Sequence, residues 1–154
     1  MGKGSFEEIL DRDGRLVYTN VGDSMMPLIR QGRDLLVIEK PEEWRTLSQN
    51  SRTIKLKRYD IPLYKRDGGR VYVLHRVLAV RHGEYVLCGD NRWSCEYGIT
   101  DRHVIGILTA VIRNGREIPL SGWKYGLYVF LWCRLFPLRA LILRGLYLIR
   151  HGHR

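Results

Sequence analysis

The stretch from residue 59 to residue 119 constrains the fold most, because it alternates short apolar runs with three turn signals, DGG, HG and NG. Glycine and asparagine tolerate positive φ, which tight connections between antiparallel strands require. No internal repeat or helical period competes with this pattern. We therefore expect a mostly β fold built on an antiparallel sheet or barrel.

Length and charge set further limits. A chain of 154 residues fits one domain, which we assign to residues 1–122 with a core over 15–113, followed by a tail over 123–154. The net charge is +10, and the tail, which contains no acidic residue, carries +6 of it. The remaining excess is diffuse and forms no Lys/Arg block, so we expect no nucleic-acid partner.

The tail is apolar, aromatic and basic, and Pro137 should divide it into two short helices. Its aliphatic side chains would gain roughly 4–8 kcal/mol on insertion, but Arg134, Arg139 and Arg144 would cost about 7–10 kcal/mol at the centre of a bilayer. Spanning is therefore disfavoured. We expect either attachment to an anionic membrane surface or simple packing against the domain.

Other segments are less informative. Residues 1–13 should form a short helix or arm and contain no apolar stretch of signal-peptide type, so we expect a cytoplasmic or peripherally membrane-associated protein. Residues 40–58 are polar and should form a loop or short helix. The three cysteines show no pairing or zinc-type spacing and should be free thiols. We expect no metal and no organic cofactor.

The segment VGDSMMPLIRQGRD contains the first candidate for chemistry, Ser24, in an exposed turn and helical turn between two strands. Pro27 is suited to begin that helical turn, where unpaired backbone N–H groups can stabilise an oxyanion. A serine in such a place can act as a nucleophile. The alternative is that Ser24 only caps the turn.

A nucleophilic serine needs a neighbouring base. In VYVLHRVLAV, strict alternation places His75 on the same face as Val71, Val73, Val77 and Ala79. A partly buried neutral imidazole there can accept a proton, although a histidine on an apolar face can also be a purely structural core residue.

The segment CGDNRWSCEYGI supplies two carboxylates, Asp90 after a strand end and Glu96 six residues later. Either can orient His75 and stabilise its imidazolium, as the acid of a catalytic triad does. Of the two, we favour Asp90.

Taken together, GDSMMP, GRDLLVIE, YDIPLY, VLHRVLAV, YVLCGDN and VIGILTAV resemble the ordered boxes of the superfamily that joins type I signal peptidases to self-cleaving SOS repressors. The resemblance covers about residues 15–113. It implies a coiled, mostly antiparallel β fold in which Ser24 attacks a peptide bound as an added strand. Met25 and Pro27 of the same box would contact the substrate.

The variant of the family that fits best is the histidine type, similar to endoplasmic-reticulum signal peptidases, because HRV occupies the segment where bacterial enzymes have a lysine base. The resemblance places Asp90 on the Gly-Asp-Asn aspartate. It places Glu96 where histidine-type enzymes have a second aspartate, and Gly22 where many bacterial enzymes have an oxyanion-hole serine. Backbone N–H groups, chiefly that of Ser24, would then have to stabilise the oxyanion.

The sequence therefore predicts a serine endopeptidase that cleaves an extended signal- or leader-peptide-like segment, with short side chains near the cut. Two further hypotheses stay open. One is a non-catalytic peptide-binding module of the same fold, and the other is a membrane-surface adaptor that acts through the tail.

Overall fold

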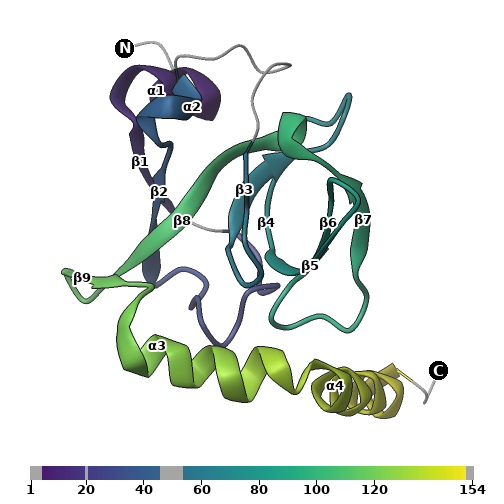
Figure 1. Ribbon diagram of the computed structural model, residues 1–154. Helices are drawn as coiled ribbons and strands as arrows, with labels where there is room; N and C mark the ends of the chain where they lie inside the picture. The colour runs from purple at the N-terminus through teal and green to yellow at the C-terminus, as the bar shows by residue number, and fades with distance from the viewer. Residues whose placement is uncertain (1–4, 20, 46–53, 152–154) are drawn as a thin grey trace.

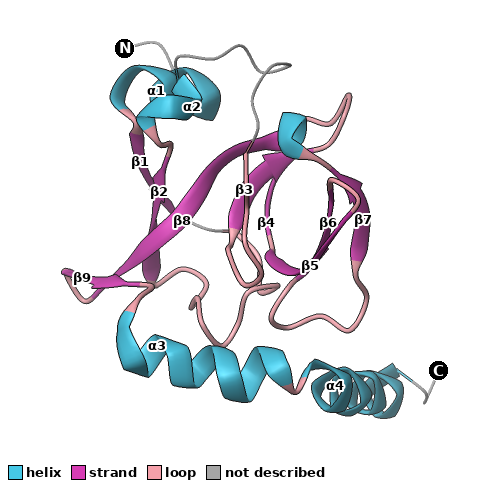
Figure 2. Ribbon diagram, viewed as in Figure 1, coloured by secondary structure: helices cyan, strands magenta, loops and turns pink. Residues whose placement is uncertain are grey.

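The computed structural model describes residues 5–19, 21–45 and 54–151 of the chain. Strands predominate, and the C-terminal part is helical (Figures 1 and 2). The elements are α1 (Phe6–Asp13), β1 (Arg15–Thr19), β2 (Asp34–Glu39), α2 (Glu42–Arg45), β3 (Pro62–Lys65), β4 (Tyr72–Leu74), β5 (Arg76–Arg81), β6 (Glu84–Cys88), β7 (Glu96–Ile99), a 3-10 turn (Asp101–His103), β8 (Val104–Arg113), β9 (Arg116–Pro119), α3 (Gly122–Tyr128), a π-helical segment (Val129–Arg134) and α4 (Phe136–His151).

The strands form two antiparallel sheets. The larger has the order β1-β2-β8-β3-β4, with β9 also paired to β8, and the smaller has the order β5-β6-β7. Figure 1 shows the long strand β8 crossing the molecule, with β3 to β7 gathered to one side of it. This curled antiparallel half-barrel, with its helical C-terminal part, confirms the predicted fold class.

All three turn signals join neighbouring strands. Asp67, Gly68 and Gly69 lie between β3 and β4, His82 and Gly83 between β5 and β6, and Asn114 and Gly115 between β8 and β9. In the last two turns both residues have positive φ, with values of 50° and 81° for the first and 52° and 74° for the second. These angles match the tight hairpin turn whose twist suits antiparallel strands.

The prediction of one continuous strand around His75 is wrong. β4 ends at Leu74 in the larger sheet and β5 begins at Arg76 in the smaller sheet, so His75 lies at the corner between them. The chain turns there because it passes from one sheet to the other, and a further register shift follows Val77. The alternation of side chains therefore does not continue across the whole segment.

Two clusters of buried side chains form the core. One lies beneath the larger sheet and includes Met25, Leu36 and Leu63, and the other includes Tyr64 and Leu87. β8 contributes residues to both clusters, so it connects the two sheets through packing, while its hydrogen bonds pair it with β2, β3 and β9 of the larger sheet.

The termini follow the predicted pattern where they are described. Ser5 is the N-cap of α1, and its side chain accepts a hydrogen bond from the backbone of Glu8 in a capping box. The tail forms two helical segments that separate next to Pro137, which lies in the first turn of α4, where its missing N–H is not needed. Within residues 40–58, where a loop or short helix was predicted, the short helix α2 forms. Residues 46–53 of this segment lie outside the described residues.

All three cysteines are free, as predicted. Burial raises the pKa of the Cys88 thiol to about 12 and that of Cys133 to about 11. Both thiols are therefore protonated and unreactive near neutral pH.

Candidate functional site

Ser24 lies in the turn between β1 and β2, partly exposed to solvent. The turn is held by a backbone hydrogen bond from Met26 to Asp23 and by Met25, whose side chain is fully buried in the core. Within the described part of the chain, neither the hydroxyl nor the backbone N–H of Ser24 forms a hydrogen bond. Both groups are thus available, one as a nucleophile and the other as an oxyanion donor.

The loop that follows β6 fixes this turn in place. The backbone N–H of Asn91 donates to the carbonyl of Ser24 at 2.8 Å, and Arg92 forms an ion pair with Asp23 at 2.6 Å. Gly89 lies against Ser24 so closely that a Cβ added there would be 2.6 Å from its carbonyl oxygen. Only glycine permits this approach.

His75 lies close to the same loop, since the charges of Asp90 and Arg92 influence the pKa of its imidazole. Arg76 of β5 pairs with Cys88 of β6, so His75 precedes and Gly89 follows the last pair of this antiparallel ladder. Ser24 and His75 therefore both lie beside the segment that follows β6, although no hydrogen bond joins their side chains. The fold brings the two residues that the sequence predicts as nucleophile and base to the same segment.

Glu96 is the acid at His75. Its Oε1 lies 3.2 Å from His75 Nδ1, while the hydroxyl of Tyr64 donates to Oε2 at 2.7 Å and Arg66 approaches Oε2 at 2.5 Å. Because the Tyr64 proton is engaged with Glu96, the proton between His75 and Glu96 belongs on Nδ1 of the imidazole. Nε2 is then left as the acceptor that a general base needs.

The electrostatics favour a neutral base beside an ionised acid. Burial lowers the pKa of His75 below its ordinary value of 6.5, and the charge of Glu96 opposes this only in part. Burial would raise the pKa of Glu96, but hydrogen bonds from Arg66 and Tyr64 and the charge of His75 bring it below its ordinary value. At neutral pH, His75 can therefore accept a proton, and Glu96 can stabilise the resulting cation.

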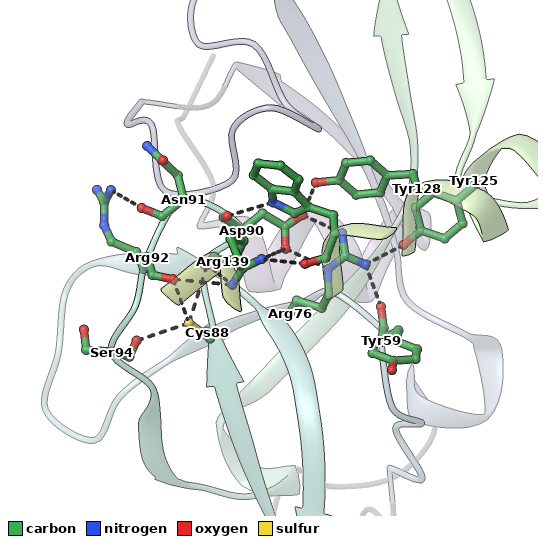
Figure 3. Close-up of polar contacts among 12 residues, drawn as sticks. Tyr59, Arg76, Cys88, Asp90, Asn91, Arg92, Ser94, Tyr125, Tyr128 and Arg139 are labelled. Atoms are coloured by element: carbon green, nitrogen blue, oxygen red, sulfur yellow. Dashed lines mark hydrogen bonds and ion pairs between the residues drawn. The ribbon is translucent and has the colours of Figure 1, made fainter. Parts of the chain in front are cut away.

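The preference for Asp90 as the partner of His75 is not met. Asp90 is buried and forms a two-bond ion pair with Arg76, at 2.8 and 2.7 Å (Figure 3). Its side chain also accepts from the Tyr128 hydroxyl at 2.8 Å, and its backbone carbonyl accepts from the indole of Trp132. Asp90 thus neutralises Arg76 and fastens the α3 segment to the sheets.

Of the two residues expected to contact substrate, Met25 does not qualify, because its side chain is fully buried in the core. The prediction that Met25 contacts the substrate is therefore wrong, and Met25 instead anchors the Ser24 turn to the core. Pro27 is exposed and lines a cavity of about 440 Å³ between this turn, the β8–β9 hairpin and α3. Within the described ranges, no cluster of three His, Cys, Asp or Glu side chains could hold a metal ion.

Sequence reasoning missed Tyr64 and Arg66. Tyr64 is buried in β3 and Arg66 follows that strand, so both reach Glu96 across a large separation in sequence. The only signal was the alternation in the DIPLY run, which cannot reveal the partner of the tyrosine hydroxyl.

Replacement of Gly89 with alanine should displace the Ser24 turn, because the nearest atom to the new methyl group would be the backbone carbonyl oxygen of Ser24, which cannot move without the turn. We expect loss of Ser24 reactivity and a stability loss of about 1–3 kcal/mol. Reactivity toward a serine-directed probe and urea unfolding measure the two effects. In the control, Gly145→Ala in α4, the methyl enters open space and should be neutral or stabilise by about 0.5–1 kcal/mol. Unchanged reactivity in Gly89→Ala would contradict the close approach.

Comparison of the chain with protein-family models, with curated proteins and with solved structures found no match.

Proposed function

We propose that this protein is a serine endopeptidase of the signal-peptidase type, with Ser24 as nucleophile, His75 as general base and Glu96 as the acid that orients the base. The contact between Glu96 Oε1 and His75 Nδ1 carries the proposal, because it holds the imidazole in the tautomer that accepts a proton through Nε2. The placement of Ser24 and His75 beside the segment that follows β6 supports the proposal.

In the reaction, Ser24 Oγ attacks the scissile carbonyl carbon while Nε2 of His75 takes the hydroxyl proton. The tetrahedral oxyanion is stabilised by backbone N–H groups, chiefly that of Ser24. Collapse breaks the C–N bond, and His75 returns its proton to the leaving amine. A water molecule, activated by His75 in the same way, then releases the acyl group and regenerates Ser24.

The unpaired edge of β4 offers a place for the substrate. Among the described elements, β4 pairs only with β3, and its C-terminal end leads directly into His75. An extended peptide that adds to this edge gains main-chain hydrogen bonds and brings its scissile bond toward the base. Substrate residues with short side chains next to the scissile bond would fit this approach of the peptide to His75. The resemblance to signal peptidases implies the same preference.

Labelling with a fluorophosphonate probe tests the proposal. We expect covalent modification of the wild-type protein, located on Ser24 by mass spectrometry, none in Ser24→Ala, and strong slowing in His75→Asn. Ser94→Ala and His82→Asn are matched controls, because both side chains are exposed and His82 has a positive φ that asparagine tolerates. Circular dichroism should confirm that each variant is folded.

A second function, a non-catalytic peptide-binding module, is favoured by one observation: Ser24 and His75 share no hydrogen bond. Catalytic hydrogen bonds often tighten only with substrate bound. A well-folded wild-type protein that resists labelling with and without vesicles, yet binds extended peptides, would replace the peptidase proposal with this one. Modification of a serine other than Ser24 would also overturn the peptidase proposal.

A further inference from the structure

The C-terminal helices present an apolar surface to the outside. We define the outer face as the large apolar side chains of residues 122–149 that are exposed by 48 to 74%, leaving out Tyr147, whose ring packs against Trp93. They are Trp123, Leu127, Phe130, Leu131, Leu135, Leu138, Leu141, Ile142, Leu146, Leu148 and Ile149. Soluble monomers rarely leave so many large side chains exposed in one region, and such patches mark interaction sites.

Several polar side chains of the same helices point inward. Arg139 is buried, and its guanidinium lies 3.4 Å from the carbonyl of Gly89. The Tyr125 hydroxyl accepts a hydrogen bond from Arg76, and Tyr128 and Trp132 donate to Asp90, as Figure 3 shows for the labelled side chains. A helix on a soluble domain shows the opposite arrangement, with apolar residues inside and polar residues outside.

This inversion explains the irregular spacing of the arginines. Arg139 is used in the interior, so it does not belong to the outer face. Lys124, Arg134 and Arg144 remain exposed. The outer surface is therefore apolar with scattered positive charges.

We propose that the outer face docks onto the surface of an anionic lipid bilayer. The apolar side chains would enter the boundary between headgroups and acyl chains, and the exposed lysine and arginines would contact anionic headgroups. This inference does not depend on the proposed peptidase activity. Docking of the outer face would place the Ser24 turn near the membrane, because the same helices form hydrogen bonds with Gly89 and Asp90, beside that turn.

Charge complementarity selects the bilayer over a second copy of the chain. Residues 122–154 contain no aspartate or glutamate, so two outer faces packed together would oppose positive charges with no acid to neutralise them. An anionic bilayer offers both an apolar medium and the opposite charge.

The shape of the helical pair favours lying on the membrane over crossing it. Among the described residues, no single helix meets the length and hydropathy criteria for a span. Gly122–Arg134 and Phe136–Ile149 meet them only together, and they are bent by 65° at the break. Arg134 and Arg144 can reach the headgroups when both helices lie in the interface.

Vesicle co-sedimentation of the full chain tests the docking. We expect binding to vesicles that contain equal amounts of phosphatidylcholine and phosphatidylglycerol, weak binding to phosphatidylcholine alone, and release at high salt. Leu138→Gln and Leu141→Gln should each weaken binding about 10-fold. Arg144→Gln should weaken it about 5-fold.

Matched controls come from the opposite end of the molecule and from a surface loop. Val17→Gln removes an exposed apolar side chain from β1, which Figure 1 places far from α3 and α4, and Arg70→Gln removes an exposed arginine. Neither should change binding.

Three results would overturn the proposal. They are failure of the folded protein to bind anionic vesicles, equal salt-resistant binding to both vesicle types, and lipid-free dimerisation that Leu138→Gln and Leu141→Gln abolish. The last result, measured by sedimentation equilibrium, would identify the outer face as a subunit interface.

Discussion

Replacement of Glu96 with glutamine should lower kcat/KM for a cleavable peptide by about 10²–10⁴-fold with little loss of folding. The amide retains the size of the side chain and can still hydrogen bond with Tyr64. Its NH2 group can, however, donate to Nδ1 of His75, which moves the imidazole proton to Nε2. The imidazole then cannot accept the proton of Ser24, and its cation loses a stabilising charge.

The pH dependence gives the same experiment a second readout. Activity requires neutral His75, so kcat/KM should rise with pH through the pKa of His75, which burial lowers below 6.5. The charge of Glu96 raises that pKa in part, so its removal should move the acidic limb of the profile to still lower pH. A purely structural role of Glu96 would not produce this shift.

Glu84→Gln is the matched control, because Glu84 is exposed on β6 and should leave both rate and profile unchanged. Full activity in Glu96→Gln, or an acidic limb displaced to higher pH, would exclude Glu96 as the acid of the triad.

Local signals in the sequence were sufficient to predict the hairpins at the HG and NG turns. The HG and NG turns specify positive φ at two consecutive residues, which is a property of the residues themselves, and both hairpins formed where expected. The break beside Pro137 follows from local chemistry in the same way.

The partner of His75 could not be predicted in this way. Asp90 and Glu96 lie six residues apart in one segment, Asp90 in the loop after β6 and Glu96 at the start of β7, and the path of that loop decides which carboxylate reaches His75. Arg76, adjacent to His75, is fully buried and requires an anion, and Asp90 supplies it. A sequence motif shows that two carboxylates are present but not which one a buried guanidinium will take.

Substitution of Asp90 with alanine should destabilise the fold by about 3–5 kcal/mol, because it leaves the charge of Arg76 buried without a partner. The side chains of Arg76 and Asp90 are 0% and 1% exposed, and the hydroxyl of Tyr128 would lose its acceptor as well. The loss is measured as a shift of the urea midpoint at constant slope. If Asp90 were instead the acid at His75, the variant would lose activity while keeping its stability.

A control variant and a rescue variant distinguish the effect of an unpaired buried charge from nonspecific destabilisation of the fold. Glu117→Ala breaks an ion pair with Arg15 whose side chains are each 45% exposed, and it should cost about 0–1 kcal/mol. Arg76→Met combined with Asp90→Ala removes both charges and should recover much of the lost stability, since the uncompensated buried charge is then absent. A double variant that is less stable than Asp90→Ala would show that Arg76 stabilises the fold through contacts other than its ion pair, such as those with Tyr59 and Tyr125.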